Sequence, residues 1–186
     1  MFIQTESTPN PATLKFIPGC PVLESGAADF PSPASATSSP LASRLFDIPE
    51  VAGVYFGADF ITVTKSNGEW HHLKPMILGA IMEHFTSGRP VMLAEGVPAG
   101  GHEWDADGDE GEIIAQIIEL LDTKVRPAVA QDGGDIVFRS FSDGVVYVHL
   151  QGSCAGCPSS TLTLKNGIEN MLKHYIPEVE EVRQVS

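Results

Sequence analysis

Two cysteines, Cys154 and Cys157, lie three residues apart in the stretch QGSCAGCPSS (residues 151–160). Such a pair of thiolates can exchange with a disulfide, bind zinc or bind an iron–sulfur cluster. We expect the stretch to follow a strand and to open a helix, where unpaired N–H groups and the helix dipole favour thiolates. Gly152, Gly156 and the small residues around them predict an accessible site that the backbone can approach closely.

Three functions are compatible with this pair. A thiol–disulfide oxidoreductase also places C-x-x-C at a helix start, although the thioredoxin-like architecture has a βαβ unit before it and a hairpin is expected here. A structural zinc site needs four protein ligands, and the sequence has no second C-x-x-C motif. A 4Fe-4S cluster needs four thiolates, which two copies of the loop facing each other across a two-fold axis would supply.

The elements expected around the pair form a small α+β domain. Apolar residues at helical spacing predict an amphipathic helix from Glu112, which Pro127 and the pair Gly133-Gly134 should end. Apolar and polar residues alternate in 135–141 and again in 145–150, with a turn between the two segments. This pattern predicts a β-hairpin. A second helix should bury one face, formed by Leu164, Ile168, Met171, Leu172 and Tyr175. With a short final strand, the order is α-β-β-α-β around a three-stranded sheet.

The corner before the hairpin has the sequence DGGD, with Asp132 and Asp135 on either side of two glycines. Two carboxylates at this spacing could serve acid–base catalysis. Glycines at a helix-to-strand corner are more typical of a turn, so we interpret both aspartates as turn residues.

The N-terminal part predicts a second small α+β domain. Its expected elements are strands at 13–17 and 21–26, a short helix opened by Ser39 and Pro40, a hairpin of 51–57 with 59–65, and a helix opened by Pro75. Between the domains, an acidic segment rich in Gly and Pro predicts a flexible linker. The expected boundaries are 1–88 and 112–186 for the domains and 89–111 for the linker.

Composition narrows the class of partner. The formal net charge is −13, and no cluster of Lys and Arg is present for a phosphate backbone, so nucleic acid is not an expected ligand. No apolar run approaches the roughly 18 residues of a membrane span. Only 3 cysteines are present, too few for a secreted disulfide framework, so a reducing compartment is expected.

Three segments resemble the Nfu-type iron–sulfur cluster carriers. ESTPNPATLKFIPG (6–19) resembles the start of the Nfu N-terminal domain, and RPAVAQDGGDI (126–136) the stretch that precedes the cysteine hairpin. LQGSCAGCPSSTLTLKNGIE (150–169) resembles the cluster-binding segment of the NifU-like C-terminal domain. All three occur in the family's order.

The resemblance implies a non-enzymatic scaffold or carrier of a 4Fe-4S cluster. It implies that Cys154 and Cys157 of two subunits hold the cluster, in a homodimer when loaded. It also implies transfer to apo-proteins such as lipoyl synthase, aconitase-like enzymes or respiratory subunits, with upstream assembly proteins as donors. Thiol–disulfide oxidoreductase remains the alternative function, and a zinc-bridged dimerisation module is the third.

Two expectations accompany the resemblance. Cys20 has no partner in the motif and is expected to be an ordinary loop or strand cysteine. No presequence is recognisable at the N-terminus, which predicts a cytoplasmic bacterial protein or, if the chain is a mature organellar form, one of the mitochondrial matrix.

Overall fold

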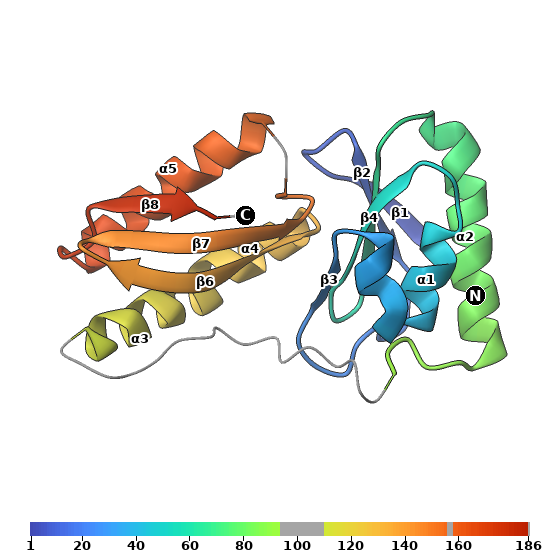
Figure 1. Ribbon diagram of the computed structural model, residues 1–186, viewed down its shortest axis with the longest axis horizontal. Coiled ribbons are helices and arrows are strands. Elements are labelled where there is room, and N and C mark those ends of the chain that lie inside the picture. Colours follow the sequence, from blue (N-terminus) through green and yellow to red (C-terminus); the bar gives the residue numbers. More distant parts are fainter. Residues whose placement is uncertain (94–109, 156–157, 186) are drawn as a thin grey trace. The chain divides into compact units, whose positions relative to one another are not determined.

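The computed structural model describes residues 1–93, 110–155 and 158–185 (Figure 1). The chain divides into two compact units, Met1–Gly100 and Gly101–Ser186, each of which mixes helices with one sheet. The fold class is therefore α+β, as the sequence predicts.

The first unit contains a five-stranded sheet in the order β1-β2-β5-β4-β3, with antiparallel neighbours throughout. Its elements are β1 (Gln4–Ser7), β2 (Thr13–Ile17), β3 (Ala28–Phe30), η1 (Pro33–Ser38), α1 (Pro40–Phe46), β4 (Val51–Phe56), β5 (Ile61–Lys65) and α2 (Trp70–Ser87). Apolar residues that alternate along the strands pack against α1 and α2 on one face. The largest fully buried side chains of this core are Phe16, Phe56, Leu41, Leu45, Ile61, Leu73, Ile77 and Ile81.

Several expected elements of this unit are confirmed. The Ser39 side chain accepts a hydrogen bond from the Ala42 N–H (3.0 Å) and caps α1, with Pro40 in the first turn. β4 and β5 pair as the expected hairpin. Two expectations are wrong: residues 21–26 form no strand, and Pro75 lies inside α2, whose first residue is Trp70. A proline there removes one helical hydrogen bond, which the buried face of α2 outweighs.

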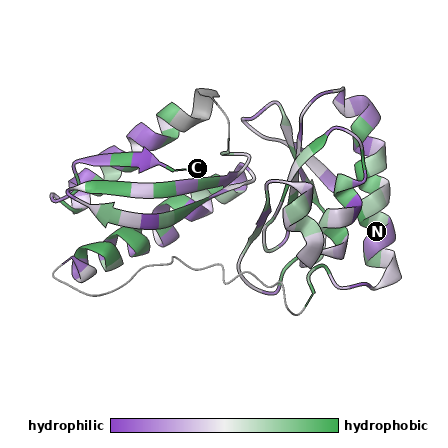
Figure 2. Cartoon of the chain, viewed as in Figure 1, coloured by the Kyte–Doolittle hydropathy of each residue, from purple (hydrophilic) through white to green (hydrophobic). Residues whose placement is uncertain are grey.

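The second unit contains a three-stranded sheet in the order β6-β7-β8. Its elements are α3 (Gly111–Leu120), η2 (Leu121–Val125), α4 (Arg126–Gln131), β6 (Gly134–Ser142), β7 (Val145–Gly152), α5 (Pro158–Tyr175) and β8 (Glu181–Gln184). β6 and β7 are antiparallel and β8 runs parallel to β7, with α5 as the crossover. Figure 2 shows hydrophobic residues along α3, β6 and β7. The expected α-β-β-α-β order is confirmed.

Two details of this unit differ from the sequence-based prediction. Pro127 does not end the first helix, which continues through η2, a wide π-helical turn, to Gln131, just before the pair Gly133-Gly134 that was also expected to end it. Because proline lacks an N–H, the wider turn just before it accommodates the missing hydrogen bond. On α5, Tyr175 is 52% exposed, whereas Ile176, just beyond the helix, is buried against Leu172 and Ile168.

Most of the expected linker, residues 94–109, lies outside the described residues, and the domain boundaries stay a prediction. Among the helices that the structure describes, none is long and apolar enough to cross a membrane.

Candidate functional site

The cysteine loop begins where the β6–β7 ladder ends. Gly134 and Gly152 are the last paired residues of the two strands, and Gly152 has a positive φ of 62°, which glycine adopts without strain. The chain then turns through Ser153 and Cys154, and the Ala155 N–H donates to the Gly152 carbonyl (3.1 Å). The hairpin thus delivers Cys154 to its own open end, as expected.

The sulfur of Cys154 packs where the side chain of residue 134 would otherwise stand. A Cβ atom built on Gly134 would lie 2.3 Å from Cys154 Sγ, far inside van der Waals contact. Cys154 is only 6% exposed and belongs to the core cluster of this unit. The expectation of an accessible thiol is therefore wrong for Cys154, because the missing side chain at Gly134 opens a space that the sulfur fills.

Ser153 ties this turn to the corner before β6. Its N–H donates to the Gly133 carbonyl (3.1 Å) and its hydroxyl to the Asp132 carbonyl (2.5 Å). Both partners lie where α4 ends, and Gly133 has a φ of 78°. Asp132 is the turn residue that the sequence predicts, and its carbonyl oxygen, rather than its carboxylate, contacts the cysteine loop.

We expect the variant Gly134→Ala to destabilise the second unit by about 1–3 kcal/mol, the usual cost of forcing an extra group into a packed core. The new methyl group must displace the Cys154 sulfur or the strand itself. Urea denaturation followed by circular dichroism would measure the loss. The matched control is Gly167→Ala on α5, where an added Cβ meets nothing within 4 Å and helix propensity favours alanine. Equal stability of the two variants would contradict the assignment of Gly134 as the space for the sulfur.

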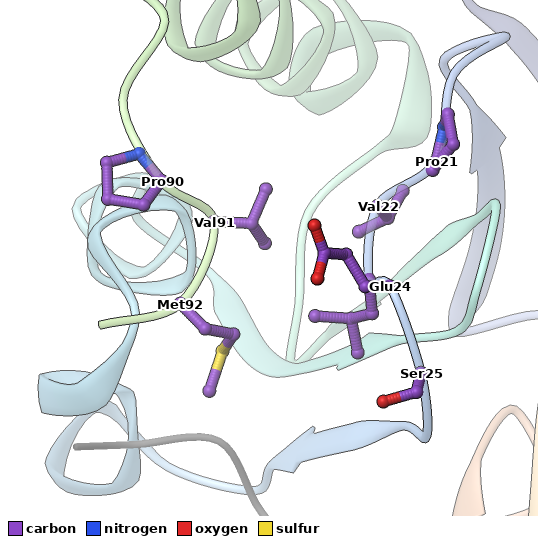
Figure 3. A pocket seen from close by; sticks show the side chains of 8 residues that line it. Pro21, Val22, Glu24, Ser25, Pro90, Val91 and Met92 are labelled. Carbon is purple, nitrogen blue, oxygen red and sulfur yellow. The ribbon is translucent and has the colours of Figure 1, made fainter. Parts of the chain in front are cut away.

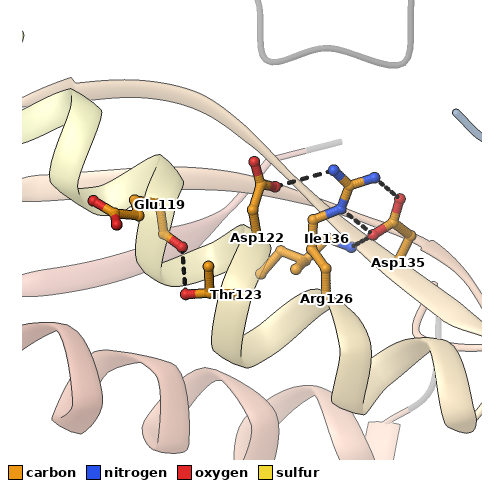
Figure 4. Close-up of polar contacts among 6 residues, drawn as sticks. All are labelled: Glu119, Asp122, Thr123, Arg126, Asp135 and Ile136. Carbon is orange, nitrogen blue, oxygen red and sulfur yellow. Dashed lines mark hydrogen bonds and ion pairs between the residues drawn. The ribbon is translucent and has the colours of Figure 1, made fainter.

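Asp135 is not the turn residue that we expected. It lies on β6, is 4% exposed, and its two carboxylate oxygens accept hydrogen bonds from Nε and Nη2 of Arg126 (2.8 and 2.9 Å; Figure 4). The N–H of Ile136 donates to the same carboxylate (2.8 Å), and Nη1 of Arg126 bonds Asp122 (3.0 Å). The hydrogen bond to Asp135 raises the pKa of Arg126 further above its ordinary value. This pair fastens the start of α4 to the strand that carries Gly134.

The other predicted site residues are separated or lie outside the described residues. Cys157 and Gly156 lie outside them, and α5 begins directly afterwards at Pro158. Cys20 belongs to the first unit and is half-buried. Neither Cys20 nor Cys154 forms a disulfide within the part of the chain that the structure describes. A group of three or more His, Cys, Asp or Glu residues able to hold a metal ion is likewise absent from that part.

Comparison with known proteins matches both units to one family. Residues 3–88 match the model "Scaffold protein Nfu/NifU N terminal", and residues 117–183 match "NifU-like domain". The NFU1 iron-sulfur cluster scaffold homolog, mitochondrial, of Homo sapiens is 57% identical over the whole of this chain, which covers 72% of that protein. NifU-like protein 4, mitochondrial, of Arabidopsis thaliana is 51% identical over 99% of this chain, which covers 66% of it.

Among solved structures, this chain is similar to the solution NMR structure of NifU-like protein from Saccharomyces cerevisiae. The match covers 50% of this chain and 84% of the chain in that structure. It is 26% identical, with a TM-score of 0.45. The sequence relatives cover both units from end to end at more than half identity, and the resemblance seen in the three sequence segments is confirmed. The chain belongs to the Nfu/NifU scaffold protein family.

Proposed function

We propose that this chain is an iron–sulfur cluster scaffold and carrier that receives a 4Fe-4S cluster as its cargo and passes it to apo-proteins. The proposal rests above all on the family match through both units, with relatives whose names describe iron–sulfur cluster scaffolds. In this proposal the ligands are Cys154 and Cys157. No catalysis by the chain itself is involved.

The number of thiolates leads to a two-subunit site. A 4Fe-4S cluster takes four cysteine thiolates, and one chain has a single C-x-x-C pair. Cys20, the remaining cysteine, belongs to the other unit. Two copies of the loop around a two-fold axis would complete the ligand set, so we propose a homodimer in the loaded state.

Ligand binding requires a local change at Cys154. With 6% exposure, its sulfur must leave the space beside Gly134 before an iron atom can reach it. Rotation about the Cα–Cβ bond, or a shift of the turn that Ser153 anchors, would bring the sulfur to the surface. The buried position would protect the thiol from oxidation while no cluster is bound.

Transfer then proceeds by ligand exchange. An incoming thiolate of the acceptor forms an Fe–S bond as the bond from iron to Cys154 or Cys157 breaks, and the released thiolate takes up a proton. The oxidation state of the cluster is unchanged. No oxidant, reductant or hydrolysis is needed.

Anaerobic reconstitution with iron and sulfide tests this function. We expect about four irons and four sulfides per dimer and a shift from smaller species to dimer on loading. Light scattering coupled to size exclusion, with iron and sulfide analysis of each peak, would measure both. Bound zinc without sulfide would support the zinc-bridged module instead, and insulin reduction without bound sulfide would support the thiol–disulfide oxidoreductase.

Acceptors and compartment complete the proposal. Lipoyl synthase, aconitase-like enzymes and respiratory subunits are the acceptors that the family resemblance suggests, with upstream assembly proteins as donors. The relatives' names contain the word mitochondrial, which supports the mitochondrial one of the two locations expected. They give no support to the bacterial cytoplasm.

A further inference from the structure

The first unit contains a pocket of about 450 Å³ that the proposed function does not use (Figure 3). Two segments far apart in sequence form its walls, residues 21–25 and residues 90–92. In Figure 3, the side chain of Val91 projects from one wall towards Val22 and Glu24 on the other, and Met92 lies below Val91 on the same wall. The carboxylate of Glu24 lies between Val22 and Val91.

Hydrogen bonds to Ser39, which caps α1, and to Ser38, the last residue of η1, fix the wall at 90–92. The Ser39 hydroxyl donates to the Val91 carbonyl (2.6 Å), and the Leu93 N–H donates to the Ser38 carbonyl (2.9 Å). Ser39 is fully buried, so the first of these bonds is shielded from water. This wall is therefore held by hydrogen bonds within the chain itself.

His84 lies on α2, a few residues before this wall. It is 5% exposed, and its Nε2 atom has no hydrogen-bond partner within the described part of the chain. Burial lowers the pKa of His84 below its ordinary value of 6.5, so the ring is neutral at pH 7. A neutral His84 ring adds no positive charge near the lining of the pocket.

The opposite wall is fixed by the turn between β4 and β5. The N–H groups of Val22 and Leu23 both donate to the Ala58 carbonyl (2.8 and 3.2 Å), and Val22 is 5% exposed. Both walls are thus held by hydrogen bonds that involve their backbone groups.

Most of the side chains that line the pocket are apolar, and one of them is acidic. Side chains of Pro21, Val22, Leu23, Pro90, Val91 and Met92 form most of it, and Glu24 and Ser25 are its polar members. The described lining contains no Lys or Arg, and the chain as a whole carries a net charge of −13. Sites for small metabolites usually present several converging polar groups, which this lining lacks.

We propose that this pocket docks an extended segment of a partner protein in which apolar side chains are followed by basic ones. The apolar side chains fill the space between Val22 and Met92, and a Lys or Arg pairs with Glu24. The acidic surface of the chain attracts the same basic segment from a distance.

Titration of the full-length ¹⁵N-labelled chain with two synthetic peptides tests the proposal. The probe is acetyl-Ser-Leu-Leu-Lys-Arg-Ser-amide, and the matched peptide has two Glu residues in place of Lys and Arg. We expect the basic peptide to shift the backbone amide signals of residues 22–25 and 91–92, and the acidic peptide to leave them unchanged. Glu24→Gln should weaken binding about threefold, the effect of one exposed ion pair. Met92→Ala should weaken it about fivefold through lost apolar contact.

The control is Glu69→Gln, which removes the same charge from an exposed residue of the same unit that does not line the pocket. It should bind the peptide like the unaltered chain. Equal losses in Glu24→Gln and Glu69→Gln would overturn the proposal, as would equal binding of both peptides or shifts confined to other residues. Concentration-dependent shifts at 22–25 and 91–92 without peptide would identify a second copy as the occupant and overturn it too.

Discussion

Cys154→Ser is expected to reduce the iron and sulfide bound after anaerobic reconstitution to below about a tenth of the unaltered level. A dimer of this variant offers two thiolates where a 4Fe-4S cluster needs four. Serine is smaller than cysteine, so its hydroxyl fits the space beside Gly134 that the sulfur occupies and the fold should survive. Iron and sulfide analysis, together with absorbance near 400 nm, would measure the loss.

Cys20→Ser is the matched control, because it makes the same substitution at a half-buried cysteine of the other unit. It should retain the full cluster content. Cys157→Ser should behave like Cys154→Ser if both cysteines are ligands. A cluster that survives Cys154→Ser, or that is lost in Cys20→Ser, would contradict the two-plus-two ligand set.

Arg126→Ala is expected to lower the free energy of unfolding of the second unit by about 3–5 kcal/mol. The substitution leaves the Asp135 carboxylate buried, with the Ile136 N–H as a remaining donor and without the guanidinium that faces it. A buried charge that loses its partner costs far more than an exposed one. Hydrogen exchange measured by mass spectrometry on peptides from β6 and β7 would report the loss directly.

Two further variants test whether the loss of stability comes from the broken ion pair or from general damage to the fold of the second unit. Arg183→Ala removes an exposed arginine paired with Glu181 in the same unit and should leave exchange nearly unchanged. The double variant Arg126→Met with Asp135→Leu removes both charges and should recover much of the stability, since apolar replacements of a buried pair are often tolerated. Exchange in Arg126→Ala as slow as in the unaltered chain would show that the ion pair does not stabilise the β6 corner.

The general fold was predictable because apolar periodicity identifies both helices and hairpins. The cap at Ser39 was enough to predict the start of α1. The alternation of apolar and polar residues was enough to predict the hairpin of β4 with β5 and the hairpin of β6 with β7. The prolines were less informative. Pro75 and Pro127 each remove one hydrogen bond, a local cost that apolar burial along the rest of the helix exceeds. Local chemistry thus identified the start of α1, whereas Pro75 and Pro127 did not mark the helix boundaries expected of them.

The candidate site was predictable in position but not in its packing. The strand, loop and helix order around Cys154 follows from local pattern. The burial of its sulfur depends on Gly134, which is 20 residues away in sequence and reaches it only through strand pairing. The ion pair between Arg126 and Asp135 was also not predictable from local pattern, because it depends on the angle at which α4 meets β6. A glycine in sequence gives no sign of which side chain will occupy the space it leaves.

The bonds from Ser153 to Asp132 and Gly133 bear on any attempt to transplant the cysteine loop into another protein. A graft of residues 151–160 alone would leave behind the two carbonyl groups that orient the turn and the glycine that receives the sulfur. The smallest portable module is therefore discontinuous, and it includes residues 132–134 as well as the loop. A designed cluster carrier built on a new hairpin should copy both pieces together.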